Sequence, residues 1–369
     1  MTGTVLITGG AGFIGRYVAQ EALERGYHVR VLDSLIEQVH GGRGRPVELN
    51  ADVELIVGDV RDESATLRAL AGVDHVIHLA AEVGVGQSMY AVDRYVSAND
   101  YGTAVLFQQL INRPVKRVVT ASSMSIYGEG LYRDADGQVH EEVVRGRRAP
   151  DGGWDPVDAQ GRPLKPAPTP EWKRPWLASV YALGKYVQER LTLTLAPAYG
   201  MECSALRLWN VYGPGQALSN PYTGVLAIFS SRLANDQAPM IFEDGLQQRD
   251  FVHVKDVARA FLLALTEPKA DGQVFNIGSG DVFTVNDVAR SVSQAMGKAI
   301  PPDVTGKSRV GDIRHCIPDI AKARAELGYA PREDFMAGLA ELAEWVARQE
   351  AVDNVAAARK ELEARGLVA

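Results

Sequence analysis

The chain has 369 residues, of which 46% are hydrophobic and 23% are charged, a composition typical of a soluble globular protein with one large domain and a smaller partner domain. Its net charge of −7 argues against a general affinity for nucleic acid or an anionic membrane, so bound phosphate must be held by local groups. Two cysteines, and no apolar run long enough to span a bilayer, exclude a zinc site built on cysteines and predict a cytoplasmic protein with no metal.

The first strong signal is a glycine-rich turn between a predicted strand and a predicted helix. Residues 5–8 form a short apolar run, and residues 9–15 (GGAGFIG) lead from it into a helical pattern. Gly9, Gly12 and Gly15 fit the spacing G-x-x-G-x-x-G, which allows a sharp turn and the close approach of a pyrophosphate. Unpaired N–H groups and the helix dipole would stabilise the phosphate charge, so we predict dinucleotide binding here.

An acidic residue follows the second predicted strand, residues 28–32. Asp33 stands at its carboxyl end, where a carboxylate can accept hydrogen bonds from both ribose hydroxyls of an adenosine. A 2′-phosphate would meet a like charge there, so NAD(H) is predicted rather than NADP(H). Two alternatives stay open: Asp33 could only cap the following turn, and Arg43 and Arg45 could offset the repulsion.

Further strands are predicted at residues 53–57 and 75–79, each followed by a helical pattern. The repeated order of strand and helix predicts an α/β fold, a Rossmann-type doubly wound parallel sheet with helices on both faces. His78 has no metal-ligand companion at useful spacing, so we expect a core histidine with satisfied hydrogen bonds. The positions expected beside a bound cofactor after these strands are Asp59, Val60, Leu79, Ala80 and Ala81.

A tyrosine and a lysine four residues apart are the strongest catalytic candidates. Tyr181 and Lys185 lie in a predicted helix, residues 178–199, where this spacing puts both side chains on one face. A neighbouring ammonium favours the phenolate, which can take a proton from a sugar hydroxyl. Ser123, just after the predicted strand at 117–121, could share that hydrogen bond. The alternatives are a chance Tyr–Lys pair and a serine that only closes a turn.

In this order, the motifs resemble those of the extended short-chain dehydrogenase/reductases, specifically the nucleotide-sugar epimerases and dehydratases. The resemblance covers roughly residues 4–345 and rests on segments 8–15, 78–81, 122–128, 210–214 and 249–256, with Asp33, Tyr181 and Lys185. It implies catalysis by Ser123, Tyr181 and Lys185, and NAD as the cofactor. The cofactor contacts that it implies are Gly9, Gly12, Phe13, Ile14, Gly15, Asp33, Asp59, Val60, Leu79, Ala80, Ala81, Asn99, Tyr181 and Lys185.

The resemblance also implies a substrate, a dTDP- or UDP-linked sugar, bound by the smaller domain. Arg249 matches an arginine that grips the phosphates, although a surface salt bridge with Asp250 or Asp244 is the alternative. The turn at residues 220–224 matches another family position near the sugar diphosphate. Arg309, Asp312 and Arg314 fall where the family closes over the nucleoside, and we select Arg314 for the diphosphate. The complete expected set is Ser123, Ser125, Asn210, Arg249 and Arg314.

The residues after the catalytic serine indicate the type of reaction. Dehydratases and decarboxylases of this family resemble one another in placing acidic residues there, whereas this chain has Met124 and Ser125. Neither can act as a carboxylate, so epimerisation at C4 through a transient 4-keto sugar is favoured. A dehydratase or decarboxylase is the alternative enzyme, and a dinucleotide-binding protein without activity is the alternative outside catalysis.

The expected domains are a NAD-binding domain at 1–208 and a mainly substrate-binding domain at 209–369. A long insert, residues 129–178, resembles that of bacterial epimerases similar to dTDP-L-rhamnose 4-epimerases, and its place beside the active site suggests a lid. The last segment, 349–365, is expected to be an amphipathic surface helix, with a dimer contact as the alternative. The family implies a homodimer through the helices that bear Asn99 and Tyr181.

Overall fold

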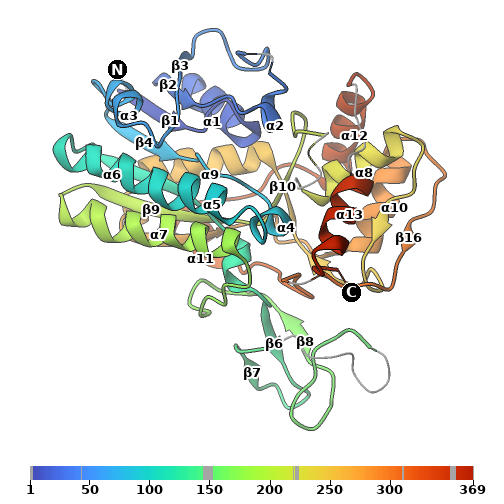
Figure 1. The fold of residues 1–369 in the computed structure, drawn as a ribbon. Helices are drawn as coiled ribbons and strands as arrows, with labels where there is room; N and C mark the ends of the chain where they lie inside the picture. The colour runs from blue at the N-terminus through green and yellow to red at the C-terminus, as the bar shows by residue number, and fades with distance from the viewer. Residues whose placement is uncertain are drawn as a thin grey trace.

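The computed structural model describes residues 3–42, 44–143, 153–218, 220, 224–309, 311–349 and 355–368. A seven-stranded sheet forms the centre of the first part of the chain, with the order β14-β9-β5-β4-β1-β2-β3 and every pair parallel (Figure 1). This confirms the predicted Rossmann-type α/β fold. Its strands are β1 (Thr4–Thr8), β2 (His28–Asp33), β3 (Glu54–Val57), β4 (His75–His78), β5 (Arg117–Ser123), β9 (Glu202–Leu208) and β14 (Gln273–Ile277).

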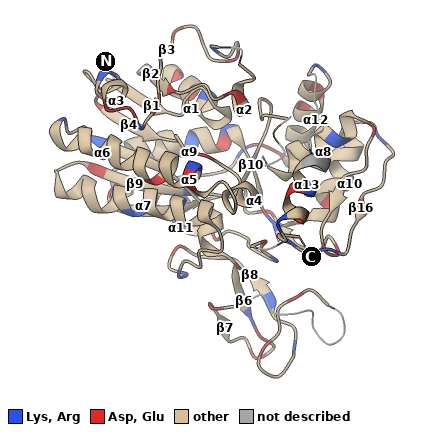
Figure 2. Ribbon diagram, viewed as in Figure 1, with Lys and Arg blue, Asp and Glu red and all other residues tan. Residues whose placement is uncertain are grey.

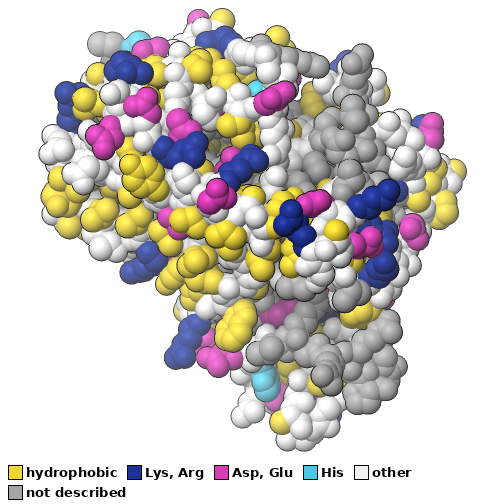
Figure 3. Space-filling view, in the orientation of Figure 1, with side chains coloured by type: hydrophobic (Ala, Val, Ile, Leu, Met, Phe, Trp, Pro, Cys, Tyr) yellow, Lys and Arg dark blue, Asp and Glu magenta, His cyan; other side chains and the backbone are white. Residues whose placement is uncertain are grey.

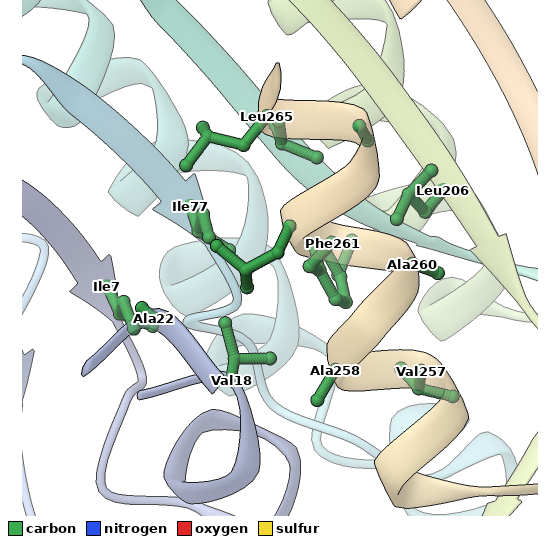
Figure 4. Packing of buried hydrophobic residues seen from close by; sticks show 14 of the residues in the cluster. Ile7, Val18, Ala22, Ile77, Leu206, Val257, Ala258, Ala260, Phe261 and Leu265 are labelled. Carbon is green, nitrogen blue, oxygen red and sulfur yellow. The ribbon is translucent and has the colours of Figure 1, made fainter. Parts of the chain in front are cut away.

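The alternation of side chains along β1 explains why helices cover both faces of the sheet. Val5 and Ile7 belong to one apolar core, and Leu6 belongs to another on the opposite face. Figure 4 shows Phe261 packed among the sheet residues of the first core. Helices α1 (Phe13–Glu24) and α9 (Val254–Thr266) cover this face, and α3 (Glu63–Ala69), α6 (Gly102–Asn112) and α7 (Val180–Ala198) cover the other.

The helix predicted around Asn99 is present, but its hydrogen bonding changes along its length. It begins as α5 (Val92–Tyr95), passes through a π-helical stretch at Val96–Tyr101, and continues as α6. Asn99 lies inside the π-helical stretch. Such stretches are often found at functional sites, because they turn a side chain that a regular helix would direct elsewhere.

The second part of the chain has its own apolar core beside the carboxyl edge of the sheet (Figure 1). Helix α11 (Ala321–Leu327), like α9 and β14, returns to the first part, where Ala323 and Leu327 join the core under α9. The elements of the second part are β10 (Asn210–Tyr212), α8 (Val225–Ala234), β11 (Met240–Ile241), β12 (Gln248–Arg249), β13 (Phe251–His253), β15 (Phe283–Thr284), α10 (Val285–Ala295), β16 (Asp303–Val304), α12 (Phe335–Val346) and α13 (Val355–Ala364).

The insert forms a small antiparallel sheet that projects from the body (Figure 1). Its strands are β6 (Leu131–Arg133), β7 (Val139–His140) and β8 (Lys165–Ala167). Across the described residues, Lys and Arg are interspersed with Asp and Glu (Figure 2). Every helix in those same ranges is too short or too polar to cross a membrane.

A buried ion pair fixes the catalytic helix to the sheet. Arg207 of β9 meets Glu189 of α7 at 2.7 Å, with side-chain exposures of 6% and 1%. The hydroxyl of Ser122 donates to the same carboxylate at 2.7 Å. The pair therefore defines where α7 lies along β5 and β9.

Replacing Arg207 by Met should lower the free energy of unfolding by about 3–5 kcal/mol, because Glu189 would keep its buried charge without a partner. Chemical denaturation measures the change. The matched control is Arg290→Met, which removes an exposed pair with Asp287 and should cost about 1 kcal/mol or less. Equal losses in the two variants would show that the buried pair has no special role.

Candidate active site

A cleft of about 1030 Å³ lies where the carboxyl ends of β1, β2, β4 and β5 face the second part of the chain. Ligands bind at this edge in doubly wound sheets. Most of the predicted site residues line the cleft: Gly9, Gly12, Phe13, Ile14, Gly15, Asp33, Asp59, Val60, Leu79, Ala80, Ala81, Ser123, Ser125, Tyr181, Lys185, Asn210 and Arg249. Two predicted residues, Asn99 and Arg314, are outside this lining.

Two glycines of the glycine-rich turn, Gly9 and Gly15, have no room for a side chain. Gly9 has a φ of +69°, and a Cβ atom there would lie 2.8 Å from the backbone of Ala80. A Cβ on Gly15 would lie 2.5 Å from the Cα atom of Gly10. Helix α1 begins directly after Gly12, which has no side chain to cap it, so the first N–H groups of the helix lie at the cleft. This arrangement fits a dinucleotide pyrophosphate.

Asp33 lines the cleft at the carboxyl end of β2. Its carboxylate accepts hydrogen bonds from the backbone N–H of Ala11 at 3.0 Å and of Leu35 at 2.9 Å, so it also caps the turn. Arg45 donates instead to backbone carbonyls at residues 50 and 53, and Arg43 lies outside the described residues. A carboxylate at this place fits a ribose with a free 2′-hydroxyl.

The loop after β3 supplies a further charged group. Asp59 accepts two hydrogen bonds from the guanidinium of Arg61, at 2.9 and 2.6 Å. These bonds are the main reason why the pKa of Asp59 is lowered. Asp59 is therefore ionised at neutral pH, and it stays beside the cofactor half of the cleft with Val60.

Ser123, Tyr181 and Lys185 come together from two elements. Ser123 ends β5, while Tyr181 and Lys185 lie in the first turns of α7, whose N-cap is Ser179. Burial raises the pKa of Tyr181, and a hydrogen bond from the Ser123 hydroxyl opposes this effect. The hydroxyl of Ser125 donates to Ser123 at 2.9 Å. At neutral pH the phenol therefore keeps its proton in the ligand-free protein, because burial has the largest effect on its pKa and Lys185 is not among the groups that shift it.

Gln188 was missed from the sequence, although it lies one turn beyond Lys185 on the same helix face. Its side-chain oxygen accepts a hydrogen bond from the Lys185 ammonium at 2.7 Å. Its amide nitrogen donates to the carbonyl of Ala80 at 3.1 Å and to Thr103 at 3.0 Å. Gln188 therefore fixes the position of the Lys185 side chain relative to the end of β4. Lys185 and Gln188 are three residues apart, which puts both on one helix face, and this spacing could have identified Gln188 from the sequence.

The core role predicted for His78 is confirmed. The ring is fully buried and contacts the hydroxyls of Thr8 at 2.7 Å and Thr103 at 2.8 Å. Burial lowers the pKa of His78 to about 3, so the ring is neutral at physiological pH.

Asn99 supports the cleft from behind. Its side-chain oxygen accepts from the N–H of Glu82 at 2.7 Å, and its amide donates to the Glu82 carbonyl at 3.1 Å. Asn99 is fully buried, so it holds the loop that carries Ala80 and Ala81 and does not itself line the cleft.

Arginine side chains mark the other half of the cleft. Arg249 donates to the carbonyls of Gln248 at 2.8 Å and Arg314 at 2.9 Å, and also to that of Ile313. The surface salt bridge considered for Arg249 is not formed, because Asp250 is buried and bonds to residues 279 and 280. Its nearest carboxylate is Asp312 at 3.9 Å. Beside it, Arg309 stacks on the ring of Phe242 at 4.6 Å, and Asn210 donates to the Asp250 carbonyl at 2.7 Å.

Arg314, selected from the sequence for the substrate diphosphate, lies elsewhere. It is 1% exposed, and its guanidinium bonds to Asp244 at 2.6 Å, Asp155 at 2.6 Å and Glu243 at 3.1 Å. These carboxylates come from the second part of the chain and from the insert, so Arg314 joins the two. Arg309 lines the cleft instead. Residues 221–223 of the turn expected near the sugar lie outside the described residues.

The segment that covers the cleft is also different from the expected one. Of the insert, residues 129–143 and 153–178 are described, and they contribute nothing to the lining. The C-terminal segment, expected to be a surface helix or a dimer contact, contributes Ala358, Arg359, Leu362 and Leu367.

A doubly wound sheet, a glycine-rich first turn and a Ser–Tyr–Lys group at the sheet's carboxyl edge define a short-chain dehydrogenase/reductase. The profile of the NAD dependent epimerase/dehydratase family matches residues 5–148 and 165–278. The chain therefore belongs to this family.

Similar proteins act on nucleotide sugars. The dTDP-L-rhamnose 4-epimerase of Burkholderia thailandensis is 37% identical over 351 residues, which cover 94% of this chain and 95% of that protein. The structure of UDP-glucose 4-epimerase from Thermotoga maritima with UDP-glucose superposes with a TM-score of 0.76 at 32% identity, covering 93% and 98% of the two chains. UDP-glucuronic acid 4-epimerase from Bacillus cereus with UDP-glucuronic acid and NAD gives 0.76 at 26% identity, with coverage of 93% and 98%.

The burial of Lys185 predicts a pH-dependent stability in the NAD-free protein. Burial lowers the pKa of Lys185 from 10.5 to about 7, with the nearby charge of Glu189 opposing the effect. Between these values the unfolded chain holds a proton that the folded chain has released, so the contribution of Lys185 to stability rises with pH. Lys185→Met removes the cost of the buried charge, so it should raise the melting temperature more at about pH 6 than at about pH 9.

Differential scanning calorimetry at the two pH values provides the test. The exposed Lys269→Met substitution is the control, and we expect its effect to be the same at both. A pH-independent effect of Lys185→Met would contradict the assigned pKa.

Proposed function

We propose that the cleft binds NAD in its glycine-rich half and a nucleotide-diphosphate sugar in its arginine-lined half, and that the enzyme inverts C4 of the sugar through a transient 4-keto intermediate. The observation that carries this function is the meeting of Ser123, Tyr181 and Lys185 inside one cleft between those two halves. Family membership and the 4-epimerases among the similar proteins support it.

Side chains of the protein transfer the proton of the sugar's C4 hydroxyl and hold the reacting groups in place. Bound NAD would supply a reversible hydride acceptor, and its positive nicotinamide ring would favour the phenolate form of Tyr181 that acts as the base. Tyr181 takes the proton of the C4 hydroxyl as the carbon is oxidised and gives a proton back when it is reduced. The Ser123 hydroxyl hydrogen-bonds to the same phenol and steadies the sugar oxygen. Lys185, aimed by Gln188, favours the phenolate and would hold the nicotinamide ribose.

The side chains around Ser123, Tyr181 and Lys185 do not favour an elimination reaction. Met124 and Ser125 supply no carboxylate next to Ser123. Glu82, the carboxylate on the loop after β4, is held by Arg94 at 2.7 Å. A dehydratase or decarboxylase needs an additional acid and base, so 4-epimerisation fits better. A dinucleotide-binding protein without activity has no use for the complete Ser–Tyr–Lys group.

The diphosphate is assigned to Arg249 and Arg309, because both line the cleft and a guanidinium suits phosphate oxygens. Phe242, under Arg309, would lie beside the nucleoside, and Ser125 and Asn210 would face the sugar. Both UDP and dTDP fit this description.

We further propose a cytoplasmic homodimer in which the chain divides into two domains after Leu208, with α9, β14 and α11 returning to the first domain. The helices that bear Asn99 and Tyr181 expose apolar side chains: Tyr101 is 55% exposed and Leu183 is 44% exposed. Figure 3 shows apolar side chains gathered on the face that these helices form. A second copy would bury them. The cysteines at 203 and 316 are free and buried, which agrees with a reducing compartment.

The fate of a C4 label tests the reaction. UDP-glucose and dTDP-L-rhamnose carrying deuterium at C4 are incubated with the NAD-loaded protein in ordinary water. We expect the label to remain at C4 in both epimers, because the same hydride leaves and returns. Mass spectrometry of the sugars also detects loss of water, which would indicate a dehydratase, while exchange of the label with solvent would exclude the proposed route.

Replacing Tyr181 by Phe should reduce turnover by about 10²- to 10⁴-fold, because the proton acceptor is lost. NAD affinity, measured by calorimetry, should stay within about twofold, since the phenyl ring remains in place. The control Tyr199→Phe changes an exposed tyrosine at the other end of α7 and should leave turnover unchanged. Activity that survives in Tyr181→Phe would disqualify this tyrosine as the base.

A further inference from the structure

The C-terminal segment, residues 358–368, lies over the half of the cleft that we assign to the sugar nucleotide. Figure 1 shows α13 beside α4 (Val85–Ser88), on the side of the molecule where the two parts of the chain meet. Arg359, Leu362 and Leu367 line the cleft. Leu362 is only 8% exposed, so α13 is not a free surface helix.

The segment contacts the first part of the chain on one side. Leu362 packs on α4, where a Cβ atom at Gly86 would meet it at 3.6 Å. Just after the end of α13, the guanidinium of Arg365 lies over the ring of Tyr90, 4.6 Å from its centroid. An apolar contact and a cation–π contact therefore hold α13 to the loop region after β4.

The same segment contacts the second part on the other side. Glu363 pairs with Lys307 at 3.0 Å, and Val368 forms a β-bridge with Arg309, the cleft arginine. Arg359 reaches Met240 of β11 at 3.0 Å. The segment thus spans the cleft from one part of the chain to the other, above the expected substrate.

Arg359 has the chemistry of an anion contact. Its Nε atom bonds to Glu363 at 2.9 Å, whereas among the described residues its Nη1 atom meets only the sulfur of Met240, which is a weak acceptor. A guanidinium that lines a cleft and has such a poor partner gains more from a phosphate oxygen. Arg249 and Arg309 line the same half of the cleft, so three guanidinium groups face one space, in which Asp312 pairs with Arg309 at 3.0 Å.

We propose that the C-terminal segment is part of the substrate site, and that Arg359 binds the diphosphate of the sugar nucleotide from a cover formed by α13. This assignment rests on the proposed function and adds a contact from beyond the catalytic core. The cover would also keep the 4-keto sugar bound until it is reduced again, so that the epimerisation is completed.

Calorimetric titration with UDP and with dTDP tests the assignment on the full-length protein with NAD bound. In Arg359→Gln we expect the dissociation constant of the better-binding nucleotide to rise about tenfold or more, because a charge-assisted hydrogen bond is lost. Lys360→Gln removes the same charge from the next residue, which is exposed and outside the cleft lining, and should change the constant by less than about twofold.

A second measurement avoids dependence on one side chain. Hydrogen exchange of residues 358–368 in the wild-type protein should slow when the nucleotide is added, since the bound diphosphate fixes the cover. Equal affinity in Arg359→Gln and wild type, or unchanged exchange in the segment, would overturn the assignment and leave the proposed function standing. Failure of both UDP and dTDP to bind the wild-type protein would overturn the two together.

Discussion

The packing of α7 against β5 is the constraint on which the site depends. Ser123 belongs to the strand and Tyr181 to the helix, so the hydrogen bond between them forms only while the two elements keep their relative position. The Arg207–Glu189 pair holds that position from within the core. Gln188, on the same helix, bonds to Lys185 and to the chain just after β4, so these groups also keep a fixed relative position. The relative position of Ser123 and Tyr181 is therefore set by a buried helix–sheet contact.

Local patterns explain why so much of the cofactor half could be predicted from the sequence. Strand, turn and helix follow one another within a few residues, and backbone crowding in this turn requires glycine at positions 9 and 15. Tyr181 and Lys185 share a helix face for the same local reason. Parallel order then brings the carboxyl ends of separate strands to one edge, which places Asp33 and Ser123 in the same cleft.

The substrate half could not be predicted equally well, because its contacts join segments far apart in sequence. Arg309 and Arg314 are equivalent in the sequence, and only the carboxylates at residues 155, 243 and 244 draw one of them away from the cleft. Similarly, the position of the insert suggested a lid, whereas α13 reaches the cleft from the end of the chain. Amphipathic character alone does not tell which surface such a helix will cover.

The buried cluster around Arg314 limits how the insert can be shortened. The insert supplies Asp155 as one counter-charge, and the backbone carbonyl of Arg314 in turn accepts from the guanidinium of Arg249. A shortened insert that lacked Asp155 would leave this buried guanidinium with Asp244 and Glu243 alone. The length of the insert therefore sets the charge balance around Arg314, next to the cleft residue Arg249.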